Sequence, residues 1–430
     1  MADRVTVIGW DGSPLTDAAR SALGAATLVA GAAHHLELPD LPAGAERVRL
    51  GSVAVAARRI ARHRGSAVVL ADGDPGFFGV VRTLRAPEYG LEVEVVPAVS
   101  SVAAAFARAG MPWDDARVVT ATSRTLRRAV NVCRAYPKVA VLTSPGAGPA
   151  ELALLLGPVH RTFVICEALG TDTEEITVIT SDKVQDHGWR DPNVVIVAGG
   201  GGPGVRTAER HPAGRETGWL SGSEPWYPRE PRGWALSAAE YARYAIPDAG
   251  GDDTMVLRLR TRPGESPTLR ASQLARLGPR TGDLVWDIGA GTGAFAVEAA
   301  RFGAAVIAVD QDLDGCARIG ATARRFGVQL QTVHGAAPQV LEDLPEPDVV
   351  RVGGGGVRTV AAVADRRPGR IVTHAATRDE AETLGRALAD GGYAVECALL
   401  QTVELDTGDN SGDWVESERA VVFLLSGVRI

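Results

Sequence analysis

A glycine-rich segment in the C-terminal half, Leu284–Gly293, has the residue types of a ligand-binding loop. It reads LVWDIGAGTG, so an apolar, strand-like run leads directly into three glycines at alternating positions. Gly289, Gly291 and Gly293 can adopt backbone angles that are closed to other residues, and they let a ligand approach the main chain. The spacing is GxGxG and differs from the GxGxxG of pyrophosphate-binding loops, so it predicts a ligand that presents no phosphate.

Acidic residues flank this loop where such a ligand needs them. Asp287 precedes the glycines, and Asp310 ends the next apolar run, Ala305–Val309, at the spacing at which an acid holds ribose hydroxyls. We therefore expect S-adenosylmethionine to bind here, with Asp287 meeting its charged amino-acid portion directly or through water. An ordinary strand–helix turn is the alternative, but the helix expected over Ala294–Arg301 and the spaced acid favour a cofactor loop. The candidate cofactor residues of this half are Asp287, Gly289, Ala290, Gly291, Thr292, Gly293, Asp310, Gly335 and Ala336.

The N-terminal half carries a different set of turns, each placed directly after an apolar run. The first contains Gly9, the second reads ADGDPGFFG over 71–79, and the third contains Ser100 and Ser101. Open parallel sheets bind ligands at the carboxyl ends of their strands, so three such turns predict a second ligand cleft. Phe77 is either a wall of that cleft or part of the core. The candidate cofactor residues here are Gly9, Asp72, Gly73, Asp74, Phe77, Ser100 and Ser101.

Two adjacent histidines, His34 and His35, raise the question of a metal site. No acid or cysteine cluster accompanies them in the sequence, which favours a surface or structural role. The four cysteines, Cys133, Cys166, Cys316 and Cys397, are widely spaced and contain no CxxC pair. We therefore expect neither a metal centre nor a disulfide framework, and this cysteine usage fits the reducing cytoplasm.

Length and charge limit the class of protein further. A chain of 430 residues is too long for one ordinary core, and a net charge of -7 gives no electrostatic attraction to nucleic acid or to an anionic membrane. No apolar run reaches the roughly 18 residues that cross a bilayer. The glycine-, proline- and charge-rich stretch 206–233 is a linker by composition, so we predict domains at 1–205 and 234–430.

Short apolar runs that alternate with helical stretches predict an α/β fold with mostly parallel sheets in both halves. The strands expected in the first half are Val5–Ile8, Thr27–Ala30, Ala67–Leu70, Val93–Val96, Arg117–Thr120, Val139–Thr143, Thr162–Glu167 and Val194–Val197, with helices over Val53–Arg62 and Val102–Arg108. Those expected in the second half are Leu284–Asp287, Ala305–Val309, Gln329–Val333, Val349–Val352 and Arg370–Thr373. Two late runs, Ala394–Leu400 and Ala420–Leu425, predict an antiparallel hairpin at a sheet edge.

Several longer stretches carry a family resemblance. In the first half these are PAVSSVAAAFARAGMPWDDARVV, LTSPGAGPAELALLL, CEALGTDTEEI and NVVIVAGG; in the second they are LGPRTGDLVWDIGAGTGAFAVEAAR, RRFGVQLQTVHGAAP and VGGGG. The first set resembles the tetrapyrrole methylase superfamily. Together the two sets, in this order, resemble the bifunctional, decarboxylating precorrin-6Y C5,15-methyltransferases of cobalamin synthesis.

This resemblance implies a two-lobed tetrapyrrole methylase domain followed by a Rossmann-like class I methyltransferase domain. It implies one S-adenosylmethionine per domain, a tetrapyrrole substrate, methylation at C5 and C15 with loss of carbon dioxide, and self-association into a homo-oligomer. In this frame Asp72, Gly73 and Asp74 contact the cofactor, Ser100 and Ser101 hydrogen-bond to it, and Gly9 clears space for the macrocycle.

A tetrapyrrole carries many carboxylates, which guanidinium groups bind in a two-pronged fashion. Arg124, Arg351 and Arg358 follow expected strands and are the candidates for this contact, although for each of them a solvated surface charge is an equal alternative.

The chain also departs from the family pattern. Thr122-Ser123-Arg124 replaces His-Gly-Arg, the stretch around Ser266 replaces Ile-Thr-Lys, Ala336 replaces an acid, and His374 replaces an asparagine. These positions leave two alternatives open. One is a diverged paralogue that acts on another precorrin or on a non-corrin molecule, with one silent domain. The other is a non-catalytic ligand-binding protein.

Overall fold

The computed structural model describes residues 4–199, 221, 233–236, 241, 266–407 and 414–430. Its contacts divide the chain into two compact units. One is built mainly from residues 1–126 and 138–198, and the other contains 127–137 and the described residues from 233 onward. Most of the predicted linker 206–233 lies outside the described residues.

The first unit begins with a five-stranded, all-parallel sheet of order β3-β2-β4-β1-β5. Its strands are β1 (Arg4–Trp10), β2 (Leu28–Gly31), β3 (Glu46–Arg49), β4 (Ala67–Asp72) and β5 (Glu92–Val96). Its helices are α1 (Asp17–Gly24), α2 (Val53–Arg62) and α3 (Val80–Leu84), with short 3₁₀ turns η1 (His34–Glu37) and η2 (Pro87–Tyr89).

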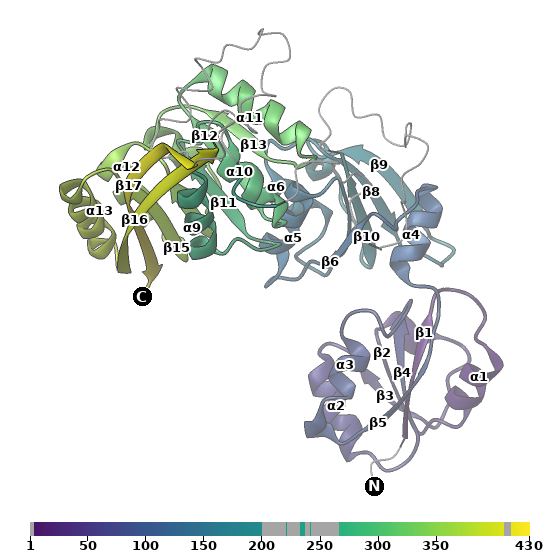
Figure 1. Cartoon of the computed structure of the whole chain (residues 1–430). Coiled ribbons are helices and arrows are strands. Elements are labelled where there is room, and N and C mark those ends of the chain that lie inside the picture. Colours follow the sequence, from purple (N-terminus) through teal and green to yellow (C-terminus); the bar gives the residue numbers. More distant parts are fainter. Residues whose placement is uncertain (1–3, 200–220, 222–232, 237–240, 242–265, 408–413) are drawn as a thin grey trace. The chain divides into compact units, whose positions relative to one another are not determined.

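Both faces of this sheet are covered, which explains why its inner strands β1, β2 and β4 are buried along most of their length. Alternate residues of a strand point to opposite faces. Val5 and Val7 of β1 pack into the core on the side of α2 and α3, whereas Ile8 packs with Leu23 of α1 on the other side. Figure 1 shows α2 and α3 on one face of the sheet and α1 on the other.

The second lobe of this unit is built on a mixed sheet of order β6-β7-β10-β8-β9. Only β6 and β7 run parallel, and the other three pairings are antiparallel, so the prediction of mostly parallel sheets is wrong for this lobe. Its elements are β6 (Arg117–Thr120), β7 (Lys138–Leu142), β8 (Thr162–Glu167), β9 (Glu175–Thr180), β10 (Asn193–Ala198), α4 (Ser101–Ala109), α6 (Pro149–Leu156) and η3 (Val184–Asp186). Helix α5 (Leu126–Ala135) follows β6 along the chain, but its contacts group it with the second unit.

The second unit contains a seven-stranded sheet of order β13-β12-β11-β14-β15-β17-β16, in which the first five strands are parallel. Its strands are β11 (Leu284–Ile288), β12 (Ala305–Asp310), β13 (Gln331–His334), β14 (Val349–Val352), β15 (Arg370–Ala375), β16 (Tyr393–Thr407) and β17 (Trp414–Arg429). Its helices are α9 (Pro267–Leu277), α10 (Ala294–Arg301), α11 (Leu313–Arg325), α12 (Gly356–Asp365) and α13 (Arg378–Asp390), with the 3₁₀ turn η5 (Gln339–Asp343).

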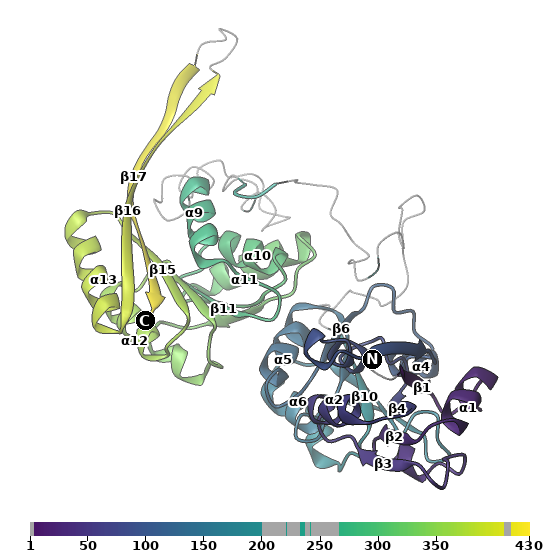
Figure 2. The same ribbon diagram turned by 90° about the horizontal axis from the view of Figure 1, so that it is seen from below.

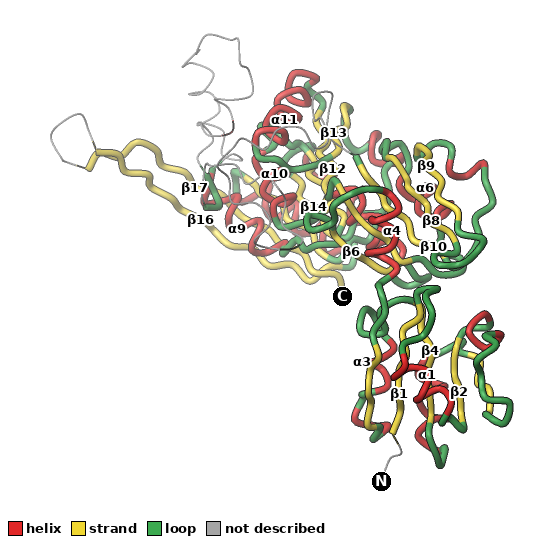
Figure 3. The backbone as a smooth tube through the Cα atoms, turned by 90° about the vertical axis from the view of Figure 1, so that its right-hand side faces the viewer, coloured by secondary structure: helices red, strands yellow, loops and turns green. Residues whose placement is uncertain are grey.

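The helices of this unit also form two layers. Leu274 of α9, Phe295 of α10 and Ile319 of α11 share one core with strand residues such as Val285. Figure 2 shows these three helices on one side of the sheet and α12 and α13 on the other. The expected hairpin is present at the sheet edge and is longer than predicted: β16 and β17 pair antiparallel and run out together beyond the other strands (Figures 2 and 3).

Candidate functional site

The first unit holds a cleft of about 200 Å³ between its two lobes. The carboxyl ends of β4 and β5 supply one wall, and those of β6 and β7 supply the other, because strand ends are where a sheet leaves room for a ligand. The lining residues are Asp72, Asp74, Phe77, Phe78, Ser100, Ser101, Thr120, Ala121, Thr122, Leu142 and Thr143. The structure therefore brings together five of the seven candidates that the sequence indicated in this half.

Gly9 and Gly73 are the two candidates that do not line the cleft, and they pack backbone against backbone. A Cβ atom on Gly9 would lie 2.3 Å from the carbonyl oxygen of Gly73 and 2.9 Å from the backbone nitrogen of Ala98. Gly73 itself has φ +61°, and a Cβ there would lie 2.7 Å from the nitrogen of Ser101. Clearance for a macrocycle by Gly9 stays a prediction, and the structure gives this glycine a packing role. It lets the turns after β1, β4 and β5 close on one another.

Side chains of these turns present hydrogen-bonding groups to the cleft. The Ser100 hydroxyl accepts a hydrogen bond from the nitrogen of Ala103 (3.1 Å) and so caps helix α4, which leaves its proton to donate. The Oδ1 atom of Asp74 accepts from the nitrogen of Gly76 (2.8 Å). Phe77 is 38% exposed and lines the cleft, which resolves its two alternatives in favour of the wall.

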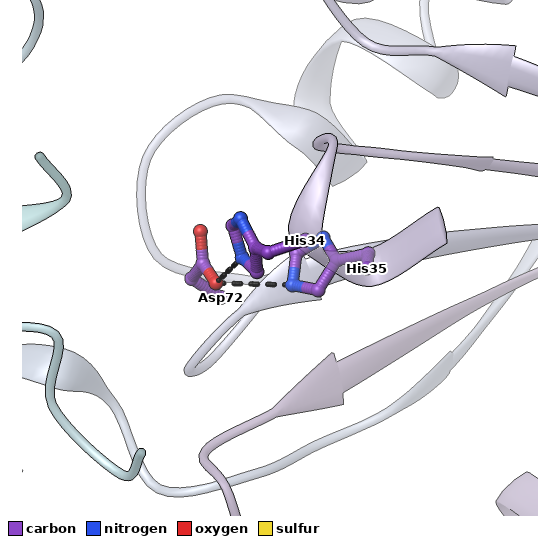
Figure 4. Close-up of side chains that lie close together, drawn as sticks. All are labelled: His34, His35 and Asp72. Atoms are coloured by element: carbon purple, nitrogen blue, oxygen red, sulfur yellow. Dashed lines mark hydrogen bonds and ion pairs between the residues drawn. The ribbon is translucent and has the colours of Figure 1, made fainter. Parts of the chain in front are cut away.

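Asp72 has two partners that the sequence did not reveal. Its Oδ1 atom lies 2.8 Å from Nε2 of His34 and 3.0 Å from Nε2 of His35 (Figure 4). The expectation that no acid accompanies the two histidines is therefore wrong, because η1 and the end of β4 meet only in the folded chain. The structural role is borne out for His35, whose side chain is 1% exposed. Within the described part of the chain, this is the one group of three His, Cys, Asp or Glu side chains able to share a metal ion.

In the second unit the glycine loop follows β11 as predicted. Gly289, Gly291 and Gly293 have φ values of +70°, +59° and +77°, which a residue with a Cβ atom adopts only under strain. The Oδ2 atom of Asp310 accepts a hydrogen bond from the Gly291 nitrogen (2.8 Å), and its Oδ1 atom accepts from the Asp312 nitrogen (2.9 Å). Asp310 thus ties the end of β12 to the middle of the loop.

The remaining candidates around this loop are divided between surface and core. The side chains of Ala290 and Thr292 are buried, so only their backbone can meet a ligand. Gly335 and Ala336 follow β13, and the Gly335 nitrogen donates to the carbonyl oxygen of Asp310 (2.9 Å). Asp310, Gly335 and Gly291 therefore lie together at the carboxyl ends of β11–β13.

Asp287 and Arg351 form a buried ion pair and do not take the roles expected of them. Asp287 is fully buried, and its Oδ1 atom accepts from Nη1 of Arg351 at 2.8 Å. Burial raises the pKa of Asp287, and the Arg351 charge opposes that rise. Arg351 lies inside β14, is 4% exposed, and also reaches the Gly289 carbonyl oxygen at 3.3 Å. Asp287 therefore supports the loop from below instead of meeting the ligand, and Arg351 cannot bind a substrate carboxylate.

A second cavity, of about 240 Å³, lies beside this loop at the carboxyl ends of β14 and β15. Its floor is the turn Gly353–Gly356, and His374, Thr373 and Glu380 contribute side chains. Burial, followed by the Arg351 charge, lowers the pKa of His374 to about 4, so its imidazole is neutral at physiological pH. The sequence indicated only the four-glycine turn. The general rule that ligands bind at carboxyl ends of strands would have pointed to Thr373 and His374.

Comparison with known proteins follows the same division of the chain. Residues 10–185 match the tetrapyrrole (corrin/porphyrin) methylases, and residues 266–413 match the precorrin methyltransferase domain. A precorrin-6Y C(5,15)-methyltransferase [decarboxylating] from a Sinorhizobium species is 33% identical over 410 residues, which cover 92% of this chain and 89% of that protein. The chain belongs to this family.

Two shorter relatives each match one part of this family's chain. A probable cobalt-precorrin-6B C(15)-methyltransferase (decarboxylating) of Pyrobaculum calidifontis is 35% identical over 166 residues, or 36% of this chain and 84% of its own. A cobalt-precorrin-7 C(5)-methyltransferase of Salmonella typhimurium is 35% identical over 169 residues, or 38% of this chain and 82% of its own. As a member of the precorrin-6Y methyltransferase family, the protein is an S-adenosylmethionine-dependent C-methyltransferase.

The chemistry of both sites fits this cofactor. None of the described residues that line the first cleft is lysine or arginine, whereas two carboxylates and several hydroxyls do line it. That set suits a ligand with a positive charge and no phosphate. In the second unit, the glycine loop with Asp310 offers backbone donors and a carboxylate, again without a basic side chain among the candidate residues.

The two other candidate arginines lie at the surface. Arg124 is exposed in the turn after β6, as expected. Arg358 is exposed too, but it lies in the first turn of helix α12 and not in a loop. None of the described helices has the length and hydropathy needed to cross a membrane.

Proposed function

We propose that this protein methylates a precorrin-6Y-type tetrapyrrole at C5 with its first unit and at C15 with its second, and that the second unit also removes carbon dioxide from an acetate side chain. The observation that carries this proposal is the presence of two separate strand-end sites with the same preference for a cationic, phosphate-free ligand. Full-length similarity to a C(5,15)-methyltransferase supports it, as does the separate similarity to single-function C(5) and C(15) enzymes.

Each unit would bind one S-adenosylmethionine, without a metal ion. In the first unit Asp72, Asp74, Ser100, Ser101 and the Phe77 wall would hold it, and the backbone of the Gly9 and Gly73 turns would support them. In the second unit the main chain of the glycine loop, Asp310, Gly335 and Ala336 would hold it. Asp287 would act through the loop and would not touch the ligand.

The bound cofactor supplies an electrophilic methyl group. The chain itself has to align the nucleophilic ring carbon, exclude water, and bind a substrate of high negative charge. An electron-rich macrocycle carbon needs no strong general base, so a site without a catalytic dyad is sufficient for transfer. Each transfer adds a methyl cation to carbon, and the ring carbon then releases a proton. In the decarboxylation, the bond between the acetate CH2 and its carboxylate carbon breaks, and the electron pair of that bond passes into the conjugated ring. Uptake of one proton then leaves a methyl group where the acetate arm was.

Substrate carboxylates would meet Arg124 near the first cleft and Arg358 near the second. Beside Arg358, the cavity of Gly353–Gly356 and His374 adjoins the cofactor loop, because a Cβ atom on Gly289 would lie 3.0 Å from the Gly354 nitrogen. We assign this cavity to the acetate arm. The neutral His374 can donate or accept a hydrogen bond there without holding the carboxylate as a permanent ion pair.

The test is mass spectrometry of precorrin-6Y after incubation with the full chain and S-adenosylmethionine. Gain of two methyl groups with loss of one carbon dioxide is the expected result. Asp74→Asn should stop the C5 methylation alone, and Asp310→Asn should impair the C15 methylation and the decarboxylation alone. Binding of the cofactor without any change in the mass of the corrin would refute the proposal and favour a diverged paralogue.

The protein is also proposed to work as a cytoplasmic homo-oligomer with a boundary between its domains in 206–233. The β16–β17 hairpin supports self-association, because Leu399, Val403, Leu405 and Trp414 are exposed by 58%, 43%, 53% and 69%. Light scattering of the wild type and of Leu405→Lys tests this. The proposal expects an oligomer that the substitution weakens. Arg378→Lys, on the exposed face of α13, is the control. A wild type that is monomeric would overturn the proposal of an oligomer.

A further inference from the structure

Two imidazoles converge on one oxygen atom at the mouth of the first cleft. His34 and His35 belong to η1, and Asp72 is the last residue of β4 and lines the cleft. The rings of both histidines point at Asp72 (Figure 4), and their Nε2 atoms lie 2.8 Å and 3.0 Å from the same Oδ1 atom. Both contacts use Oδ1, so neither histidine engages the second carboxylate oxygen, Oδ2.

The proton positions favour hydrogen bonding over metal ligation. The backbone nitrogen of Ala32 donates to Nδ1 of His35 at 3.2 Å, so this ring accepts at Nδ1 and carries its proton on Nε2. A protonated Nε2 has no lone pair for a metal ion, but it presents its proton to Asp72. The His34 contact at 2.8 Å is a hydrogen bond, and Nε2 of His35 faces the same oxygen at 3.0 Å.

His34 is the histidine whose pKa is shifted by its contact with Asp72. The hydrogen bond that His34 donates to Asp72 raises the pKa of His34 above its ordinary value, against the opposing effect of burial. Glu37 on the same turn adds a smaller effect in the same direction. The other nearby carboxylates are engaged by backbone: Asp74 accepts from Gly76, and Asp11 accepts from Val99 at 2.9 Å.

We propose that His34 and His35 are positioning residues for Asp72, which hold its carboxylate at the cofactor cleft and couple cofactor binding to the proton on His34. The inference rests on the proposed function of the first cleft. A protonated His34 neutralises the charge of Asp72, so the carboxylate attracts a sulfonium or accepts from a ribose hydroxyl less strongly. Cofactor affinity therefore rises as His34 loses its proton, and by linkage the bound cofactor lowers the pKa of His34.

Trp10 can serve as a spectroscopic probe of His34 and His35, because its ring centroid lies 6.3 Å from that of His34 and 5.8 Å from that of His35. The experiment uses the full chain labelled with 5-fluorotryptophan, and the fluorine resonance of Trp10 is assigned by its disappearance in Trp10→Phe. Titration with S-adenosylmethionine from about pH 6 to about pH 9 then gives the dissociation constant of this cleft alone.

The wild-type dissociation constant should fall with rising pH, by about tenfold for each unit by which the cofactor lowers the pKa of His34. His34→Gln keeps a donor but cannot titrate, so it should bind with the tight, high-pH constant at every pH. His63→Gln is the matched control. His63 is in the same lobe and bonds to Thr27 at 2.8 Å, so this variant should keep the wild-type profile.

A wild-type profile that is flat, or one that His34→Gln reproduces, overturns the coupling while leaving the cofactor site intact. Retention of one zinc ion per chain that is lost in His34→Gln overturns it in favour of a metal centre. If the Trp10 resonance does not shift on addition of S-adenosylmethionine at any pH, this cleft is not the cofactor site. The proposed function of the first unit then fails, and the inference fails with it.

Discussion

Arg351 donates to Asp287 at 2.8 Å beneath the glycine loop of the second unit, and both side chains are almost completely buried. The pair joins β14 to β11, the two central strands of the sheet, directly below the loop that would hold the cofactor. A buried pair of this kind adds little net stability, but removal of one partner leaves an uncompensated charge and costs about 3–5 kcal/mol. The loop geometry therefore depends on an interaction that no ligand touches.

Arg351→Met should lower the unfolding free energy of the second unit by about 3–5 kcal/mol, because Asp287 would keep its charge without a partner. The double variant Asp287→Asn/Arg351→Met should recover part of that loss, since it buries no charge. Denaturant unfolding of the four members of this cycle measures the coupling. Equal stability of the single and double variants would contradict it.

The same single variant should become more stable as the pH falls. Without Arg351, burial alone would act on the pKa of Asp287 and hold it above its unfolded value. The folded state then binds this proton more tightly than the unfolded state does. The unfolding free energy therefore falls as pH rises from the unfolded pKa of about 4 to the higher folded pKa of Asp287. Thermal unfolding of Arg351→Met from about pH 5 to about pH 8 checks the sign, with the double variant as a control that lacks this carboxyl.

Gly9→Ala should disable the first cleft selectively. The new Cβ atom would lie 2.3 Å from the Gly73 carbonyl oxygen, and backbone cannot yield as a flexible side chain can. We expect a loss of about 1–3 kcal/mol in stability and a loss of C5 methylation, with C15 methylation retained. Gly24→Ala is the control, because its Cβ atom would meet nothing within 4 Å. Product analysis that shows normal C5 methylation in Gly9→Ala would refute this role.

The ion pair between His34 and Asp72 predicts a pH-dependent contribution to stability. The folded pKa of His34 is raised, so its stabilisation is complete below the unfolded pKa of about 6.5 and is lost as pH rises through the folded value. The difference in unfolding midpoint between the wild type and His34→Gln, followed at the Trp10 resonance, should therefore shrink from about pH 5.5 to about pH 9. A constant difference would show that His34 contributes by packing alone.

Asp310→Asn should weaken cofactor binding in the second unit. The carboxylate accepts from the nitrogens of Gly291 and Asp312, and an amide can replace only one of these two acceptors. A hydrogen bond to a charged group contributes about 1.5–3 kcal/mol, so the dissociation constant should rise by about 10- to 150-fold. Calorimetry with S-adenosylmethionine tests this against Asp314→Asn, which is exposed in the first turn of α11 and should bind normally.

Two strands, β3 and β9, were not predicted from the sequence, and both lie at sheet edges. β3 (Glu46–Arg49) has three charged residues and a single valine, and β9 (Glu175–Thr180) exposes four of its six residues. An edge strand pairs on one side only and is buried less than a central strand, so it lacks the continuous buried apolar run that marked β4 or β11. Strand direction in the second lobe was also missed, because an apolar run does not encode the direction of its neighbours.

The sequence by itself determined the two glycine-bearing turns that we propose hold the cofactor, since glycines after an apolar strand act through local backbone geometry that neighbouring residues set. It determined the order of the two units and most of the central strands for the same reason. Only the tertiary structure decided that His34 and His35 meet Asp72, that Arg351 neutralises Asp287, and that Gly9 packs against Gly73. Each of these contacts joins residues from separate strands or turns, and their distance is set by how the strands pair in the sheet, which no local pattern records.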